Sequence, residues 1–316
     1  MSFYFIKAGL QTSIQDSGRQ GFMHLGISHS GAMDRNSQKL ANQLVDKSPD
    51  SAVFEIAFFG PTIRFETAMT IAICGAIFDL KLNNQPVSND ETILAKKNDL
   101  LEFKQVQKGA RAYLAFSGEL TIEETLESYS THLTANLGGV DNRQIADGDC
   151  LSTKNNTLLP YKKISHQLAI NYSGNYLLRC VVSVESVLFS RQQIDQFFCQ
   201  RFQVTPALNR MGIRLQSNPI RLASPLEIVS SGLTTGSVQI TPSGQAIISA
   251  VDGQTIGGYP RIANVITTDL PLLGQLTTND QLQFTLVNQT FAEKSLLQQE
   301  QLLMPCKVTS TQLESS

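Results

Sequence analysis

The stretch Ser237–Val251, which reads SVQITPSGQAIISAV, carries the pattern that decides the fold. It holds two short apolar runs, 237–240 and 245–251, separated by a segment that contains Pro242 and Gly244. Short runs rich in Val and Ile and bounded by Gly, Pro, Asn or Asp are typical of strands in barrels and sandwiches. The stretch therefore predicts strands, and we expect a mainly β protein.

The same pattern recurs on both sides of this stretch. Further strand-like runs are Ser2–Lys7, Phe54–Phe65, Thr70–Leu82, Leu100–Phe103, Arg111–Ser117, Tyr176–Val184 and Leu226–Val229. A polar turn with an Asp precedes an apolar residue at Lys97–Leu101, Asp147–Leu151 and Thr278–Leu282, as in Asx-type turns. This recurrence is compatible with repeated barrel-like units and equally with three independent turns.

Helices are expected to be few. One opens near Asp34 and carries Leu40, Leu44 and Val45 on one face. A second spans 190–202 behind a Ser190 N-cap, with Ile194, Phe197, Phe198 and Phe202 sharing a face. A third, Ala292–Leu303, precedes an end rich in Ser, Thr and Gln.

The length of 316 residues predicts about two domains. We place the first at 1–165 and the second at 174–288, with a helical or disordered tail at 289–316. The polar segment Thr153–Ser173 contains Pro160 and lacks a clear period, so it is the expected linker.

Composition excludes several classes of protein. Hydrophobic residues make up 41% and charged residues 16%, which is ordinary for a globular chain. A net charge of -2 offers no basic field for nucleic acid, and no apolar run approaches the length of a membrane helix. Five cysteines without C-x-x-C spacing, and no export leader, predict buried reduced thiols in a cytoplasmic protein.

The densest group of special residues is Asp252–Pro260, DGQTIGGYP. The paired glycines Gly257 and Gly258 permit a ligand to approach the backbone closely, while Gln254 and Tyr259 offer an amide and a hydroxyl. We interpret it as a binding loop, although glycines that serve only the geometry of a connection would give the same pattern.

Two other clusters are candidates. Gly26–Arg35 leads into the first helix, where Asp34 and Arg35 either orient a polar substrate or simply cap the helix. The segment Asn209–Arg214 contains Arg210, whose guanidinium can bind a carboxylate through two hydrogen bonds. Further along the chain, the Gln239 amide can donate to a carbonyl. Surface ion pairing is the alternative for the arginine.

Other kinds of chemistry lack support in the sequence. His24 and His29 are wrongly spaced for one metal on a helix and have no completing acidic cluster. There is no G-x-S-x-G elbow, no phosphate loop of the G-x-x-x-x-G-K-[ST] type and no Rossmann glycine motif. We therefore expect no bound metal or cofactor in this chain alone.

Several ordered motifs together resemble one family, the biotin-dependent carboxyltransferase-domain family, also called allophanate hydrolase subunit 2. Its stand-alone bacterial members include the C-type subunits of 5-oxoprolinase and the KipA-like proteins. The resemblance rests on Gly9–Arg19, Ser30–Arg35, Leu40–Asn42, Phe59–Pro61, Arg210–Gly212 and Asp252–Pro260.

The resemblance implies two β-rich, barrel-like subdomains, the later one cyclophilin-like. It also implies a sister subunit of related fold (of the allophanate hydrolase subunit 1 kind, the B-type subunit in 5-oxoprolinase) and a LamB/YcsF-type subunit. The implied activity is the ATP-dependent opening of 5-oxoproline to L-glutamate, with ATP handled by the complex. Alternatives are carboxyl transfer to urea or a related amide with a biotinyl partner, and a non-catalytic antagonist of a kinase inhibitor.

Carried over position by position, the resemblance implies a cleft shared by both halves. The implied catalytic residues are Asp34, Arg210 and Tyr259, and the implied substrate-binding residues are Arg35, Asn42, Gln239, Gln254, Gly257 and Gly258. Arg210 would hold an anionic group, the two glutamines a carbonyl, and Tyr259 would donate a hydrogen bond or relay a proton.

Three positions depart from the family pattern. Asn209 stands where relatives have Asp, Glu119 lies in a stretch that reads Gly-Gly-Ile-Asp in relatives, and Tyr129 replaces an arginine. These departures leave the substrate less determined than the fold.

Overall fold

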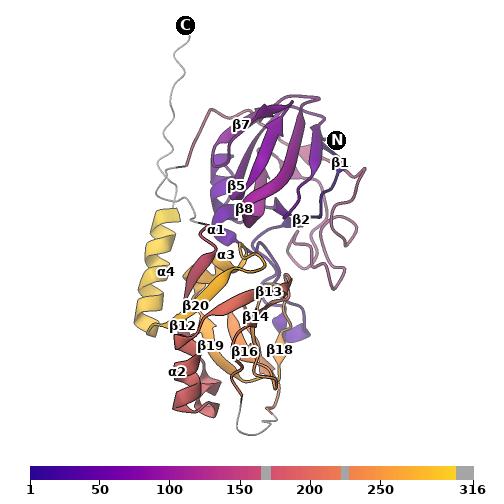
Figure 1. Cartoon of the computed structure of the whole chain (residues 1–316). Helices are drawn as coiled ribbons and strands as arrows, with labels where there is room; N and C mark the ends of the chain where they lie inside the picture. Colours follow the sequence, from indigo (N-terminus) through magenta and orange to yellow (C-terminus); the bar gives the residue numbers. More distant parts are fainter. Residues whose placement is uncertain (165–171, 222–227, 304–316) are drawn as a thin grey trace. The chain divides into compact units, whose positions relative to one another are not determined.

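The computed structural model describes residues 1–164, 172–221 and 228–303. The chain divides into two compact units, which Figure 1 colours along the sequence. Of the described residues, the first unit holds 1–19, 30–164 and 302–303, and the second holds 20–29, 172–221 and 228–301. The chain thus changes unit inside the predicted linker, but residues 20–29 join the second unit, which no local feature of the sequence indicated.

Strands dominate the first unit, as predicted. Nine strands of its described part form one sheet in the order β10-β1-β4-β8-β3-β2, with β5 branching from β8 and pairing β6 and β7. The bounds are β1 Phe3–Lys7, β2 Gln11–Gln15, β3 Val53–Ala57, β4 Thr62–Phe65, β5 Met69–Leu82, β6 Gln85–Pro86, β7 Thr92–Ala95, β8 Leu100–Phe116 and β10 Cys150–Leu151. The short strands β9 (Glu119–Leu120) and β11 (Thr153–Lys154) pair separately.

Two strand predictions in this unit are corrected. The run Phe54–Phe65 is two strands, because Phe58 has a φ of 61° and turns the chain between them. The runs Leu100–Phe103 and Arg111–Ser117 are parts of the single strand β8, whose polar middle stays in the sheet through irregular pairing with β5. Exposure of that middle section hid its strand character in the sequence.

The core of the first unit is aromatic. Phe3 packs edge-on against Phe54 with ring centroids 5.2 Å apart, and Phe5 and Phe116 also contact Phe54.

Helix α1 (Arg35–Leu44) begins after the Asp34 N-cap and buries Leu40 and Leu44 in a separate cluster. The predicted first helix is therefore confirmed.

The second unit is a closed barrel in the order β12-β19-β16-β17-β14-β13-β20, which confirms the predicted barrel-like fold. The bounds are β12 Asn175–Val182, β13 Phe202–Leu208, β14 Gly212–Gln216, β16 Ser237–Ile240, β17 Ala246–Ser249, β19 Arg261–Val265 and β20 Gln281–Leu286. A two-stranded ribbon of β15 (Ser231–Gly232) and β18 (Ile256–Gly257) carries the glycine-rich loop. Part of the predicted strand Leu226–Val229 lies outside the described residues, and 228–229 are not in a strand.

Short helices and helical turns complete the described structure. Helix α2 (Arg191–Cys199) has the expected Ser190 cap, and the Ser190 N–H in turn donates to Gln193 Oε1 at 2.6 Å. Phe202 was wrongly assigned to this helix, because it begins β13 and packs in the barrel core against Phe284. The remaining elements are η1 Met23–Leu25, η3 Val184–Leu188, η4 Thr267–Asp269, α3 Leu270–Leu273 and α4 Gln289–Leu303, the last confirming the C-terminal helix.

Surface features qualify other expectations. Of the described cysteines, Cys74 and Cys180 are buried, but Cys150 and Cys199 are exposed, so the expectation that most are buried is wrong for these two. They lie on the edge strand β10 and in the last turn of α2.

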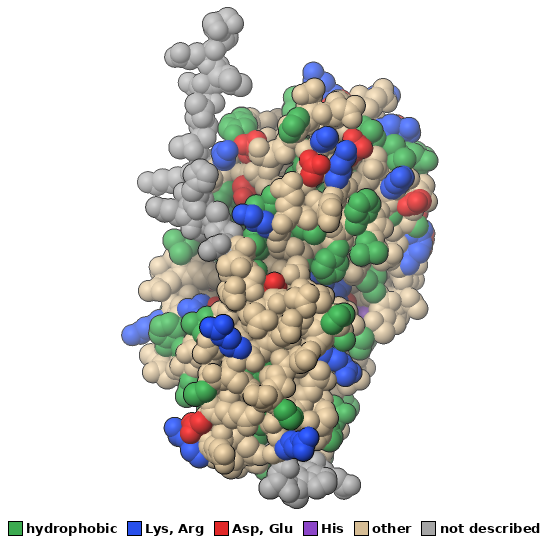
Figure 2. Space-filling view, in the orientation of Figure 1, with side chains coloured by type: hydrophobic (Ala, Val, Ile, Leu, Met, Phe, Trp, Pro, Cys, Tyr) green, Lys and Arg blue, Asp and Glu red, His purple; other side chains and the backbone are tan. Residues whose placement is uncertain are grey.

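No helix in the described ranges is long and apolar enough to cross a membrane. The face in Figure 2 mixes acidic and basic side chains rather than presenting one sign.

Candidate functional site

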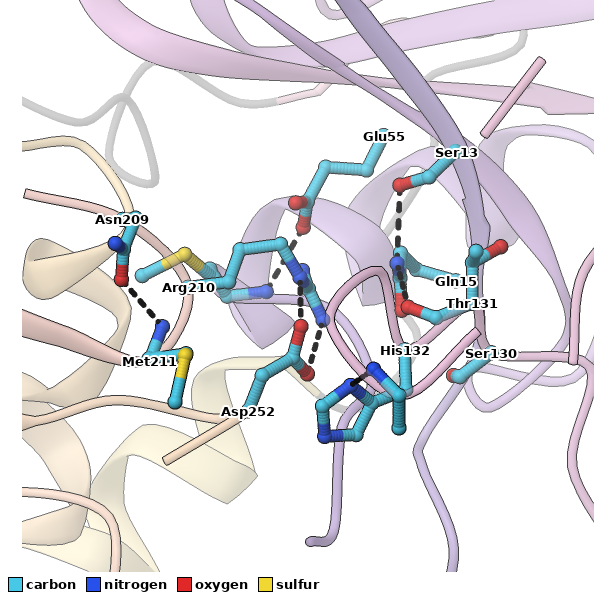
Figure 3. Close-up of polar contacts among 12 residues, drawn as sticks. Ser13, Gln15, Glu55, Ser130, Thr131, His132, Asn209, Arg210, Met211 and Asp252 are labelled. Carbon is cyan, nitrogen blue, oxygen red and sulfur yellow. Dashed lines mark hydrogen bonds and ion pairs between the residues drawn. The ribbon is translucent and has the colours of Figure 1, made fainter. Parts of the chain in front are cut away.

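The polar site of the second unit centres on a buried ion pair. The guanidinium of Arg210 donates from Nε to Asp252 Oδ2 at 2.7 Å and from Nη2 to Oδ1 at 3.0 Å, as Figure 3 shows. The backbone N–H of Asp252 also donates to the Arg210 carbonyl at 2.7 Å. Arg210 is therefore held at the start of the glycine-rich loop by Asp252, a partner that the sequence pattern did not predict.

Asn209 has a clear structural task beside this pair. Its Oδ1 accepts hydrogen bonds from the backbone N–H groups of Met211 at 2.8 Å and Gly212 at 3.2 Å. An aspartate at this position would offer the same acceptor oxygen. The departure from the family pattern thus retains the capping oxygen of the turn, and the carboxylate beside Arg210 comes from Asp252.

The glycine-rich loop is arranged around Gln239. The Gln239 amide donates to the Tyr259 carbonyl at 3.3 Å. A Cβ on Gly257 would lie 2.6 Å from the same amide nitrogen, so this glycine permits the close approach. Gln254 is exposed and the Tyr259 side chain is 45% exposed, which leaves their polar groups open to a small molecule.

A second ion pair anchors the β15–β18 ribbon. Arg261 Nε donates to Glu185 Oε2 at 2.9 Å, and Arg261 Nη2 donates to the Ser231 hydroxyl at 2.8 Å. The hydrogen bonds from the arginine lower the pKa of the Glu185 carboxyl below its usual value. The ribbon that carries the loop is thereby tied to η3 and β19.

In the first unit, the start of α1 lies on a buried polar network. The Asp34 carboxylate caps the helix by accepting from the Ser37 N–H at 3.0 Å. The Asp34 N–H donates to the Tyr113 hydroxyl at 2.7 Å, and that hydroxyl donates to Glu55 Oε2 at 2.9 Å. Burial, then the Glu55 charge, raises the pKa of Tyr113 well above its ordinary value. Arg111, also buried, approaches Glu55 at 3.6 Å.

The other predicted residues of this unit differ in exposure. Arg35 is exposed and its guanidinium donates to the Ser17 carbonyl at 2.7 Å. Asn42 is fully buried, and its amide donates to the carbonyls of Pro49 and Ser51. Asp34 is also fully buried. The structure thus gives Asp34 and Asn42 contacts that shape α1, whereas Arg35 alone of the three reaches solvent.

The Asp16 carboxylate organises the loop around Tyr129, although nothing in the local sequence indicated this role. Asp16 Oδ1 accepts from the Ser128 hydroxyl at 2.7 Å and also from the Ser130 hydroxyl, and Oδ2 accepts from the Tyr129 N–H at 2.6 Å. The backbone at Tyr129 is therefore firmly held although the family's arginine is missing. The Asp16–Arg19 part of a quoted family motif was the available signal.

Nearby buried groups stabilise the same loop. Arg19, which is fully buried, donates from Nε to the Thr125 carbonyl at 3.2 Å and also to the Ser130 carbonyl. The Gln15 amide bridges the Ser13 hydroxyl and the Thr131 carbonyl, both at 3.0 Å (Figure 3). Together with Asp16 these contacts fix the loop from several sides.

In the second unit, Arg210 contacts the start of the glycine-rich loop through Asp252, and Gln239 contacts its end through the Tyr259 carbonyl. Arg210, Gln239, Gly257, Gly258 and Tyr259 gather on and beside one loop, and Asp34 and Arg35 are adjacent at the start of α1. The cleft shared by both halves stays a prediction. Among the described residues, no three His, Cys, Asp or Glu side chains are grouped to hold a metal ion.

These features define a two-unit β protein with a closed barrel and loop-borne polar groups in each unit. The chain belongs to the family of the carboxyltransferase domain, subdomain A and B, whose model matches residues 25–286.

Three relatives show how far the similarity extends. The chain is 32% identical to the 5-oxoprolinase C-type subunit of Haemophilus influenzae, covering 90% of this chain and 91% of that protein. It is 34% identical to the protein of the same name from Escherichia coli, covering 88% and 89%. The crystal structure of Kluyveromyces lactis urea carboxylase matches all of this chain at a TM-score of 0.91 and 28% identity, but only 30% of its own chain is covered.

Proposed function

We propose that this chain is the C-type subunit of an ATP-dependent 5-oxoprolinase complex and helps to open 5-oxoproline to L-glutamate. The observation that carries the proposal is the nearly end-to-end match to two proteins of that name, at 91% and 89% of their lengths. The naming of those relatives as subunits supports a multi-subunit assembly. We assign ATP handling to partners, because the sequence has no phosphate-binding loop.

The accessible groups of the glycine-rich loop suit this reaction. Opening the lactam breaks the ring C–N bond, and water supplies the hydroxyl of the new carboxylate and a proton for the nitrogen. The hydroxyl of the exposed residue Tyr259 and the amide of the exposed residue Gln254 can donate hydrogen bonds to a lactam carbonyl. In this proposal Arg210, Asp252 and Gln239 hold the loop in shape, and Tyr259 contacts the substrate.

The test is co-purification with a B-type sister subunit and a LamB/YcsF-type protein, followed by an assay of glutamate from 5-oxoproline and ATP. We expect glutamate from the full complex and none from this chain alone. Tyr259→Phe should lower turnover, whereas Tyr161→Phe, on an exposed tyrosine of the first unit, should leave it unchanged. An assembled complex that forms no glutamate would refute the proposal.

A second function is favoured by one observation. The structural match to urea carboxylase, with a TM-score of 0.91 over the whole chain, supports carboxyl transfer to urea or a related amide. That activity requires a biotinyl partner. Transfer of carboxylate from carboxybiotin to urea by this chain and its partner, without glutamate formation, would favour this second function.

A further inference from the structure

The Phe59-Gly60-Pro61 motif borders a hollow in the first unit that the proposed function does not use. The hollow measures about 460 Å³, within the range of small-molecule sites. The residues that line it include Lys7, Phe59, Thr62, Asp79, Glu102 and Lys104. These residues come from β1, β4, β5, β8 and the turn before β4.

A strained turn holds an aromatic ring in solvent at the rim. Phe58 has a φ of 61°, and the Phe59 N–H donates to the Ala57 carbonyl at 2.7 Å, which closes a γ-turn with positive φ. The Phe59 side chain that follows is 54% exposed. Backbone strain of this kind recurs at ligand sites, where the surrounding structure enforces it.

Close packing beneath the turn fixes its position. A Cβ on Gly60 would lie 2.3 Å from Phe103 Cβ, and a Cβ on Gly9 would lie 2.5 Å from the Phe59 carbonyl oxygen. Both positions therefore require glycine, because a larger side chain would clash with its neighbours. This requirement explains Gly60 in the motif. Packing does not explain the exposed Phe59 ring, so the ring is available for a ligand.

Charges of both signs line the same hollow. In the described part of the chain, the side chains of Lys7, Asp79, Glu102 and Lys104 have no ion pair within 4.0 Å. Lys7 lies opposite Thr62, and Thr62 lies opposite Glu102, so the backbones of Lys7 and Glu102 are two strand spacings, about 10 Å, apart. A ligand that carries both a positive and a negative group can pair with side chains of both signs in this hollow.

We propose that this hollow binds a small zwitterion of the α-amino-acid class with an apolar side chain. Its carboxylate pairs with Lys7 or Lys104, its ammonium pairs with Asp79 or Glu102, and its side chain packs on Phe59. A ligand with only one charge forms one of these two ion pairs, and a purely apolar ligand forms neither.

The test is calorimetric titration of the full chain with L-phenylalanine, and with N-acetyl-L-phenylalanine and L-phenylalanine methyl ester as ligands that each lack one charge. We expect saturable binding of L-phenylalanine and at least roughly tenfold weaker binding of both analogues. Phe59→Ala, Glu102→Gln and Lys104→Gln should each weaken binding several-fold. Lys108→Gln, exposed on the same strand β8 but outside the hollow, is the matched control.

Several outcomes would overturn the proposal. These are no saturable binding, equal binding of the charge-deficient analogues, and wild-type affinity in all three lining variants. Thermal unfolding of each variant confirms that it is folded before titration. The proposal concerns a site of the first unit, so the absence of 5-oxoprolinase activity has no bearing on it.

Discussion

At the scale of single residues, the polar site of the second unit is most sensitive to substitution at the Arg210–Asp252 ion pair. The two side chains are 4% and 1% exposed and make two hydrogen bonds to each other. Removing one partner of such a pair leaves an uncompensated buried charge, which costs more than the pair itself contributes.

We therefore predict that Asp252→Asn lowers the free energy of unfolding by about 3–5 kcal/mol. Denaturant unfolding of the purified chain measures it. The control is Asp195→Asn, whose partner Arg191 is 87% exposed, and which should change stability by less than about 1 kcal/mol. Equal effects of the two substitutions would contradict the prediction.

Lys47 gives a pH-dependent prediction. Its ammonium donates to the Gly118 carbonyl at 2.8 Å and lies 4.6 Å from the centre of the Phe116 ring. Burial lowers the pKa of Lys47 to about 8 from 10.5, against an opposing effect of Glu119. Between these two pH values the unfolded chain holds the Lys47 proton and the folded chain does not, so this residue makes stability rise with pH.

The check compares urea unfolding of the wild type and Lys47→Met at several pH values from 7 to about 10.5. We expect the wild type to gain stability relative to the variant across this window. A constant difference between the two proteins would show that the pKa of Lys47 is not lowered.

At the scale of elements, the three Asp-containing turns are built alike. In each turn the Asp carboxylate accepts from the backbone N–H three residues earlier, at 2.7, 2.8 and 2.7 Å. The turns comprise Lys96–Asp99, Ala146–Asp149 and Thr277–Asp280, and their third residues, Asn98, Gly148 and Asn279, have positive φ. The predicted polar turns are present, but the Asx-type assignment is wrong, because each Asp side chain bonds a backbone N–H three residues earlier and not one two residues later. Whether they mark repeated units stays a prediction.

The glycine-rich loop gives a prediction with a built-in control. An added methyl at Gly257 would lie 2.6 Å from the Gln239 amide, whereas at Gly258 the nearest atom is 3.4 Å away. Gly257→Ala should displace Gln239 from the Tyr259 carbonyl and, under the proposed function, lower turnover several-fold. Gly258→Ala should have a smaller effect. The test measures the turnover of both variants in the assembled complex. Equal losses of turnover in the two variants would contradict the prediction.

At the scale of the whole molecule, each unit has its own hydrophobic core. Phe54 is fully buried in the sheet of the first unit, and Phe202 is fully buried in the barrel of the second. Cores of this kind are close-packed, so truncation of one large side chain creates a cavity.

Phe54→Ala should therefore destabilise the first unit by about 3–5 kcal/mol. We expect hydrogen exchange to show the larger loss of amide protection in β3 and β8, and a smaller loss in β16 and β17 of the barrel. Phe202→Ala should give the reverse pattern. Equal loss of protection in both units for either variant would show that they unfold together.

The sequence by itself determined the strand-rich class, the starts of α1 and α2 and the glycine-rich loop. Each follows from local patterns, namely β-branched runs between turn residues and capping side chains such as Asp34 and Ser190. Where exposure or a single backbone angle interrupted the pattern, as in the middle of β8 and at Phe58, the prediction was wrong.

Only the tertiary structure decided the strand order, the closure of the barrel and the polar partners. Asp252 lies 42 residues from Arg210, and Asp16 lies 112 residues from Ser128. Such pairs depend on how strands are brought together, and a hydrogen bond across that separation leaves no periodic or local trace in the chain. The type of each side chain was therefore readable in the sequence, but its partner was not.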